Sequence, residues 1–310
     1  MKTIRIGTRA SKLALVQSEM IRDILMKNNP GLSVELLKIK TTGDKILDAP
    51  LSKIGDKGLF TKEIEKELLA GTVDLAVHSM KDMPTALPEG LTIGAVTVRL
   101  NPRDVFITRK GLKLADLKSG GTIATGSLRR RAQLMAFSPS LKILDIRGNV
   151  QSRLKKMDDN PVIDGMILAC AGIERLGIQE LISEIIPEEI ITPAVGQASL
   201  AIEIRSGDTA IQKLIDPLND PDSATAIGCE RAFLGELGGG CQVPIAGYAR
   251  VSNGTLTLNG MIASLDGSEV YRDTQSGPAS EFKSIAKKLA TMLLDRGGRA
   301  ILEEIYGYSL

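Results

Sequence analysis

The chain of 310 residues is long enough for about two domains, and a third can be accommodated. Its 39 Lys and Arg residues nearly balance 37 Asp and Glu, and a net charge of +2 argues against a surface built for nucleic acid or membranes. One histidine and three cysteines without CxxC spacing argue against zinc sites and a disulfide framework. Without a long apolar run or a signal peptide, a soluble cytoplasmic protein is expected.

Strands and helices alternate at the start of the chain. Strands are expected at 4–6, 33–40 and 74–77, with one helix beginning after Ser11 and another over 59–70 that ends at Gly71. This alternation predicts an α/β unit with a largely parallel sheet, whose ligands bind at the carboxyl ends of the strands. Arg9 and Asp82 both stand at such ends.

The pattern changes near 98–103, where a second α/β unit begins. It is expected to contain strands at 104–108, 121–125, 142–146 and 163–168 and helices from about Ser127 and Asn149. The chain then crosses back near 191–193, and a strand at 199–204 joins the first unit. A helix at 222–236, strands at 245–251 and 255–262 joined by an Asn-Gly turn, and a helix at 279–296 predict a separate α+β domain. The expected domains are residues 1–98 with 197–217, residues 99–196 and residues 218–310.

Basic residues crowd the segment 129–156, although the whole chain is almost neutral. They are Arg129, Arg130, Arg131, Lys142, Arg147, Arg153, Lys155 and Lys156, and the one acid among them is Asp145. Several stand where a strand leads into a helix, and helix N-termini attract anions. Arginine also suits carboxylates by its planar fork. A solvated charged face is the simpler explanation and nucleic acid is a rival ligand, but the pattern favours a small polyanion.

The segment 78–84, His-Ser-Met-Lys-Asp-Met-Pro, follows a short buried strand. Asp82 can accept a hydrogen bond from a substrate N–H, stabilise a developing cation or move a proton, while Lys81 favours its ionised form. A turn in which Asp82 bonds its own backbone is an equal alternative. His78, at the strand edge, is more typical of a packed polar residue than of a catalyst.

Cys241 is the thiol best placed for chemistry, because three glycines before it form an open loop. Cys170 and Cys229 have apolar neighbours and are expected to pack in the interior. With a single histidine a Cys–His hydrolase is disfavoured, and an attachment point for a covalently held group fits Cys241 better. No phosphate-binding glycine motif is present, and the cationic loop 55–60 is either a mobile lid over an anion or a plain surface loop.

Seven short stretches, in order along the chain, resemble one family. They are 7–14 (GTRASKLA), 58–63 (GLFTKE), 77–84 (VHSMKDMP), 127–130 (SLRR), 146–150 (IRGNV), 193–197 (PAVGQ) and 239–241 (GGC). Each alone is weak, but together they span nearly the whole chain. The chain thereby resembles the porphobilinogen deaminases, also called hydroxymethylbilane synthases.

The resemblance implies a transferase that joins four porphobilinogen units head to tail, with loss of ammonia, into the linear tetrapyrrole hydroxymethylbilane. The product grows on a dipyrromethane cofactor held by a thioether, and Cys241 matches the attachment cysteine. Asp82 matches the catalytic aspartate, which contacts pyrrole N–H groups and assists deamination and the methylene-pyrrolenine cation. Positions that match the binding of acetate and propionate side chains are Arg9, Ser11, Arg129, Arg130, Arg147, Arg153 and Arg175. Ser79, Lys81, Thr125, Ser127 and Gln197 line the same cleft by analogy, and Lys53, Lys57 and Phe60 belong to the mobile loop.

The family's fold implies two α/β domains like those of type II periplasmic binding proteins, plus a smaller C-terminal α+β domain that carries the cysteine. A monomer that needs no metal, nucleic acid or membrane is expected. Two residues depart from the family pattern: Gly126 replaces a small hydroxyl residue, and Ala198 stands where glycine is common. The alternatives are a non-enzymatic two-lobed protein that binds a small anion, which has no use for Cys241, and a nucleic-acid binder, which near-neutrality and 3% aromatic residues disfavour.

Overall fold

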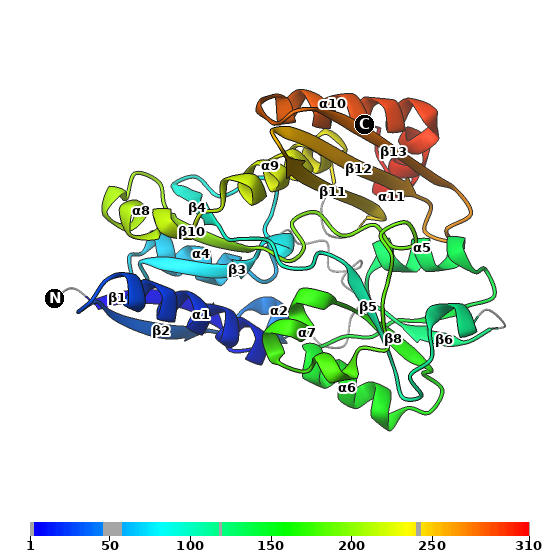
Figure 1. Ribbon diagram of the computed structural model, residues 1–310, viewed down its shortest axis with the longest axis horizontal. Helices are drawn as coiled ribbons and strands as arrows, with labels where there is room; N and C mark the ends of the chain where they lie inside the picture. The colour runs from blue at the N-terminus through cyan, green and yellow to red at the C-terminus, as the bar shows by residue number, and fades with distance from the viewer. Residues whose placement is uncertain (1–2, 46–57, 118–119, 240–242, 310) are drawn as a thin grey trace.

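The computed structural model describes residues 3–45, 58–117, 120–239 and 243–309, which form three sheets with helices packed against them (Figure 1). The first sheet has the order β2-β1-β3-β10-β4. Its strands are β1 (Thr3–Arg9), β2 (Ser33–Ile39), β3 (Leu75–Ser79), β4 (Leu91–Val96) and β10 (Leu200–Arg205). Its helices are α1 (Lys12–Asn28), α2 (Thr42–Lys45), α4 (Lys62–Leu69) and α8 (Thr209–Ile215), with the short η1 (Met80–Asp82) after β3.

The second sheet has the order β7-β6-β8-β5-β9. Its strands are β5 (Asp104–Thr108), β6 (Thr122–Ala124), β7 (Lys142–Leu144), β8 (Gly165–Ala169) and β9 (Glu184–Ile185). It is accompanied by α5 (Leu128–Phe137), α6 (Val150–Asp159), α7 (Cys170–Leu176), η2 (Leu114–Leu117) and η3 (Gln179–Leu181). The first and second sheets and their helices are called lobe 1 and lobe 2 below.

Each five-stranded sheet is packed on both faces. In lobe 1, α1 places Ile21 and Leu25 on one face, and α4 places Ile64 and Leu68 on the other. In lobe 2, Leu134 of α5 lies on one face, and α6 and α7 cover the other. The apolar periodicity of each helix therefore sets which side faces its sheet.

The expectation of largely parallel sheets is confirmed, with one reversed strand in each lobe. In lobe 1, β1 pairs in parallel with β2 and β3, but β10 runs antiparallel to β3 and β4. Lobe 2 repeats this arrangement, because β5 is antiparallel to β8 and β9. The reversed strands are the two that follow the crossings between lobes, near 97–103 and 186–199, so no helix within their own lobe sets their direction.

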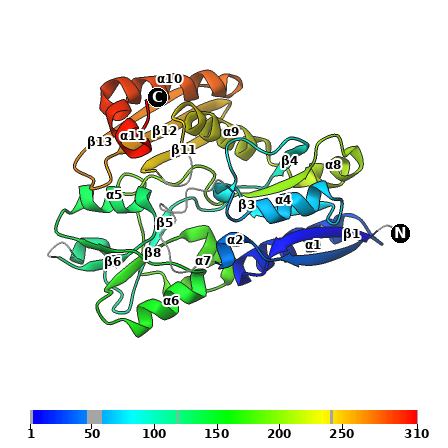
Figure 2. The same cartoon turned by 180° about the vertical axis from the view of Figure 1, so that it is seen from behind.

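The third sheet, β11-β12-β13, is antiparallel throughout. It contains β11 (Ile245–Ser252), β12 (Thr255–Ala263) and β13 (Val270–Pro278), and the expected turn at 253–254 has positive φ at both residues. Around it lie α9 (Pro221–Glu236), η5 (Ala279–Glu281), α10 (Phe282–Leu293), η6 (Leu294–Gly298) and α11 (Arg299–Tyr306), whereas η4 (Asp216–Leu218) packs on lobe 1. The sheet lies between α9 with α10 on one side and α5 of lobe 2 on the other, as Figure 2 shows from behind.

The expected helix starts are confirmed by their caps. The side chains of Ser11, Ser127 and Asn149 accept hydrogen bonds from the first turns of α1, α5 and α6. The helix expected from residue 59 begins only at Lys62, because residues 58–61 form a turn. The strand expected over 74–77 continues to Ser79, since His78 and Ser79 pair with β10. No described helix is both long and apolar enough to cross a lipid bilayer.

Candidate functional site

Asp82 lies at the end of η1, directly after the carboxyl end of β3. The start of this segment is fixed from two sides: the Met80 amide donates to the Ser199 carbonyl (3.0 Å), and Gln17 Nε2 of α1 donates to Ser79 Oγ (3.0 Å). Burial lowers the pKa of the neighbouring Lys81 to about 8, against the opposing effect of Asp82. A carboxylate and an ammonium group thus stand together at the strand edge that the sequence predicted.

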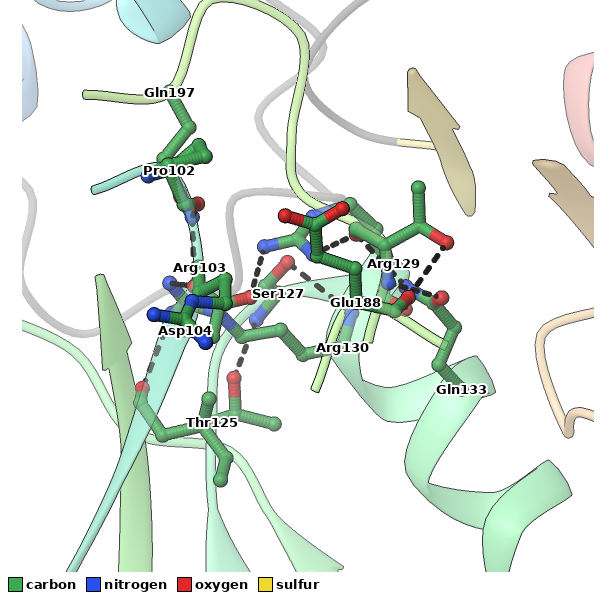
Figure 3. Close-up of polar contacts among 12 residues, drawn as sticks. Pro102, Arg103, Asp104, Thr125, Ser127, Arg129, Arg130, Gln133, Glu188 and Gln197 are labelled. Carbon is green, nitrogen blue, oxygen red and sulfur yellow. Dashed lines mark hydrogen bonds and ion pairs between the residues drawn. The ribbon is translucent and has the colours of Figure 1, made fainter. Parts of the chain in front are cut away.

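Arg129 and Arg130 are buried and share one carboxylate. Asp104, the first residue of β5, is fully buried, and its two oxygens bind Arg129 Nη2 at 2.8 Å and Arg130 Nη2 at 2.7 Å (Figure 3). Gln197 Nε2 donates to the same carboxylate at 2.9 Å. Burial alone would raise the pKa of Asp104, but the two guanidinium groups outweigh it and hold this pKa well below its usual range. The pair therefore retains one net positive charge.

Arg153 is a residue of lobe 2 whose charge interacts with lobe 1. Its Nε donates to the Gly148 carbonyl at 2.7 Å, which anchors the side chain beside the start of α6. Burial lowers its pKa to about 10, Arg130 lowers it further, and Asp82 of lobe 1 acts in the opposite direction. Lys81 likewise interacts with Arg129 and Arg130. The structure therefore brings Asp82 and Lys81 together with the arginines of the other lobe.

Arg147 and Arg175 extend this basic group. Burial lowers the pKa of both, to about 10 for Arg175. Arg175 Nη2 donates to the carbonyl of Ala198 at 2.7 Å, and Ala198 adopts a φ of 86° that favours glycine. In the part of the chain that the structure describes, neither arginine nor Arg153 forms an ion pair with a carboxylate. These cations therefore lack the kind of counterion that Asp104 provides for its pair.

Arg9 and Phe60 form a separate group in lobe 1. The Arg9 guanidinium binds Asp44 (Nη2 to Oδ1, 2.5 Å) and stacks on the Phe60 ring at 4.1 Å from its centroid. Asp44 also accepts a hydrogen bond from Thr41. Arg9 thus already has an anionic partner, which an incoming carboxylate would have to replace.

The predicted hydroxyl residues mainly support local structure. Ser11 and Ser127 cap their helices, and Thr125 Oγ1 accepts from the Ser127 amide at 3.3 Å. Of the basic segment, the side chains of Arg131, Lys142, Lys155 and Lys156 are exposed. The run of positive charge predicted from the sequence therefore divides into a buried group and a solvated face.

The described cysteines are unsuited to chemistry. Cys170 and Cys229 are buried, and burial raises the pKa of each thiol to about 12. Their predicted packing in the interior is confirmed. Cys241, Lys53 and Lys57, which the sequence analysis singled out, lie outside the described residues.

Comparison with known proteins identifies the family. Residues 4–213 match the model of "Porphobilinogen deaminase, dipyromethane cofactor binding domain", and residues 224–295 match that of the "Porphobilinogen deaminase, C-terminal domain". The chain belongs to the porphobilinogen deaminase family. The porphobilinogen deaminase of Syntrophomonas wolfei is 52% identical over 98% of this chain and 99% of its own. Those of Syntrophobacter fumaroxidans and Geobacter metallireducens are each 50% identical over 98% of this chain, and over 98% and 95% of their own lengths.

Membership of the porphobilinogen deaminase family raises the question of how dipyrromethane would be held. Its carboxylate side chains need cationic hydrogen-bond donors. Among the described residues, Arg130 and Arg175 each have a buried Nε without a hydrogen-bond partner, and Arg147 and Arg153 form no ion pair with a carboxylate, although Asp145 acts on both from a distance. The donor set therefore fits an acidic pyrrole ligand.

Sequence reasoning missed three polar residues of the site. Asp104 neutralises the buried arginine pair, Asp44 binds Arg9, and Gln17 fixes Ser79. Only Asp104 left a signal in the sequence, as an acid at the start of an otherwise apolar strand next to Arg103. The other two lie on unremarkable polar stretches.

Proposed function

We propose that this chain is a hydroxymethylbilane synthase, which condenses four porphobilinogen units into the linear tetrapyrrole. Each addition forms one carbon–carbon bond between the aminomethyl carbon of the incoming unit and a ring carbon. The amine leaves as ammonia, and the ring carbon gives up its proton. When bound through Cys241, dipyrromethane supplies the ring carbon for the first addition.

Asp82 is the residue to which we assign the chemistry. We expect its carboxylate to accept a hydrogen bond from a pyrrole N–H and to stabilise the positive charge that develops as ammonia leaves. The observation that carries the proposal is the position of Asp82 directly after the carboxyl end of β3, where its charge acts on Arg153 of the other lobe. A substrate bound there has its ring beside a carboxylate and its own carboxylates beside cations.

The arginines are assigned to binding. Hydrogen-bond donors or positive charge remain available for ligand carboxylates at Arg130, Arg147, Arg153 and Arg175. Arg129, in contrast, already binds Asp104 and the Thr192 carbonyl. Arg9 is expected to exchange Asp44 for a ligand carboxylate. Ser79, Lys81 and Gln197 hold the surrounding backbone and charge, while Ser11, Thr125 and Ser127 set the helix starts next to the ligand.

The intact mass of the purified chain tests this assignment. The wild type, produced in a host that makes porphobilinogen, should carry an adduct of dipyrromethane size that disappears in Cys241→Ser. The matched substitution Cys229→Ser changes a buried thiol and should keep the adduct. An unmodified and inactive wild type would contradict the proposal.

The role of Asp82 is tested separately. Asp82→Asn should retain the adduct but lose about 100-fold or more in turnover, the range typical of a group that acts on charge or protons in the transition state. Asp116→Asn, a change of the same kind on the exposed η2, provides the control. Full activity of Asp82→Asn would refute its role.

We further infer a monomer in the cytoplasm with no nucleic-acid partner. The net charge is only +2, and Arg129 and Arg130 of the basic segment are buried, which supports a small ligand. The proposed domains are residues 1–98 with 197–217, residues 99–196 and residues 218–310. Sedimentation should give the mass of one chain, and limited proteolysis should cut near these boundaries.

A further inference from the structure

Three buried polar side chains meet beneath the segment that carries Asp82. His78, the single histidine of the chain, is 5% exposed on β3, Glu203 is 0% exposed on β10, and Glu65 is 5% exposed on α4. In a strand alternate side chains point to the same face, so His78 lies on the face of Ala76, which packs against α4. The proposed mechanism uses none of the three.

The contacts leave this cluster short of hydrogen-bond donors. His78 Nε2 and Glu203 Oε2 are 3.0 Å apart. The second oxygen of Glu203 (Oε1) and Glu65 Oε1 are both buried, and neither has a well-aligned hydrogen-bond partner within the described residues. The one neighbouring hydroxyl that acts on Glu65 is that of Thr61. A buried carboxylate oxygen without a partner is destabilising. A proton held by one carboxyl group converts an acceptor into a donor and removes part of this cost.

The surrounding charges indicate which group holds that proton. Arg205, two residues beyond Glu203, donates to the carbonyls of Leu68 and Val73 and binds Asp208. Burial and the Glu203 carboxylate raise the pKa of Glu65, while Thr61, His78 and the exposed Lys62 act in the opposite direction. Burial of Glu65 therefore favours its neutral form.

The position of the cluster connects it with Asp82. His78 lies opposite Ala201 in the β3–β10 pairing, and Glu203 lies opposite Ala76, so the His78–Glu203 contact ties the two strands diagonally. The pairing ends at Ser79 and Leu200, and the Met80 amide then binds the Ser199 carbonyl. Asp82 follows two residues later. A change in the strand register at His78 would therefore move Asp82.

We propose that Glu65, His78 and Glu203 form a proton-sharing cluster that positions Asp82. Glu65 is a neutral carboxylic acid, and the Nε2–H of His78 donates to Glu203. The three are positioning residues, because they act through the end of β3. The link to Asp82 rests on the proposed function, but the state of the cluster does not.

Nuclear magnetic resonance of the imidazole tests the cluster directly. Since the chain has one histidine, its ring signals need no residue assignment, and two-bond couplings to the ring protons distinguish Nε2 from Nδ1. At pH 8 we expect a slowly exchanging proton on Nε2 in the wild type and in Glu203→Gln, whose amide oxygen can still accept it. Glu203→Leu should lose this signal, and Glu65→Gln, which resembles a neutral acid, should keep it. An Nε2 without a proton in the wild type would overturn the cluster.

Steady-state kinetics of the holoenzyme test the link to Asp82. Glu203→Leu should lower kcat about tenfold with KM changed less than about twofold, because a small displacement of a reacting group is costly. Glu203→Gln should recover kcat to within about threefold. The matched control is Asp74→Leu, which removes a buried carboxylate (paired with Arg5 and, at 3.7 Å, with Arg205) just before the opposite end of β3 and should leave kcat within about twofold.

Hydrogen exchange of residues 79–82 separates failure of this inference from failure of the proposed function, because it requires no turnover. Exchange of the Met80 amide should accelerate at least about tenfold in Glu203→Leu and remain unchanged in Asp74→Leu at a matched loss of Tm. Equal effects of the two substitutions on exchange and kcat would reduce the cluster to ordinary core packing and overturn its positioning role.

Discussion

At the scale of single residues, the carboxylate of Asp104 is placed between two buried guanidinium groups. Removing its charge in Asp104→Asn leaves Arg129 and Arg130 buried side by side without a counterion. Because an uncompensated buried charge is expensive, we expect the free energy of unfolding to fall by about 3–5 kcal/mol. Urea denaturation followed by circular dichroism measures this loss.

The control for Asp104 is Asp158→Asn on the exposed face of α6 in the same lobe, which should change the free energy of unfolding by less than about 0.5 kcal/mol. If the two substitutions were equally mild, the arginine pair would not depend on Asp104. Asp104 would then be a hydrogen-bond acceptor and no more.

Lys81 gives the site a dependence on pH. Burial lowers its pKa to about 8, so the ammonium charge is present below pH 8 and is lost as the pH rises through that value. Because this charge attracts substrate carboxylates, kcat/KM for porphobilinogen should fall above about pH 8, by up to tenfold per pH unit. Lys81→Arg keeps its charge and should hold kcat/KM level to about pH 9.5. Superimposable profiles for the two enzymes would contradict this role.

At the scale of elements, Gly126 shows how closely the loops before α5 and α6 approach. A Cβ at this position would lie 2.8 Å from the Ile146 carbonyl oxygen and 2.9 Å from Asp145 Oδ1. Gly126→Ala therefore has to displace the segment that leads to Arg147, and we expect a loss of about 1–3 kcal/mol in the free energy of unfolding. It should also raise KM, since Arg147 moves with that segment.

Gly235 in α9 provides the matched control, because a Cβ there meets nothing within 4 Å. Gly235→Ala should stabilise the chain by about 0.5–1 kcal/mol through helix propensity. Denaturant unfolding of the two variants, measured side by side, should therefore show changes of opposite sign in the free energy of unfolding. A stabilising Gly126→Ala would show that the loops have room for the hydroxyl residue usual in the family.

The sequence predicted the starts of helices well, because the residues that set them are neighbours along the chain. Ser127 and Asn149 cap their helices because a short polar side chain reaches the next turn, and this is visible in the sequence. The direction of β10 was missed, because its partners β3 and β4 lie more than a hundred residues away. For the same reason Asp104 and Asp44 were missed. A residue's charge can be read from the sequence, but the partner that neutralises it depends on the fold.

At the scale of the whole molecule, the buried Glu230 of α9 connects the C-terminal domain to the two segments that cross between the lobes. Its carboxylate binds Arg99 on the crossing between the lobes (2.5 Å) and accepts from the amides of Gly196 on the return crossing (2.7 Å) and Ala249 of β11 (2.7 Å). The C-terminal sheet has its own apolar core around Phe233. A charged junction, rather than that core, therefore connects it to both crossings.

Glu230→Gln should separate the C-terminal unit from the lobes. The substitution leaves Arg99 without its counterion, so we expect a loss of about 3–5 kcal/mol in the free energy of unfolding. Because the C-terminal core remains intact, calorimetry should resolve two transitions where the wild type has one. Glu236→Gln, on an exposed position of the same helix, should leave a single transition. A single, merely lowered transition in Glu230→Gln would mean that apolar contacts such as Ala132 with Met261 couple the units instead.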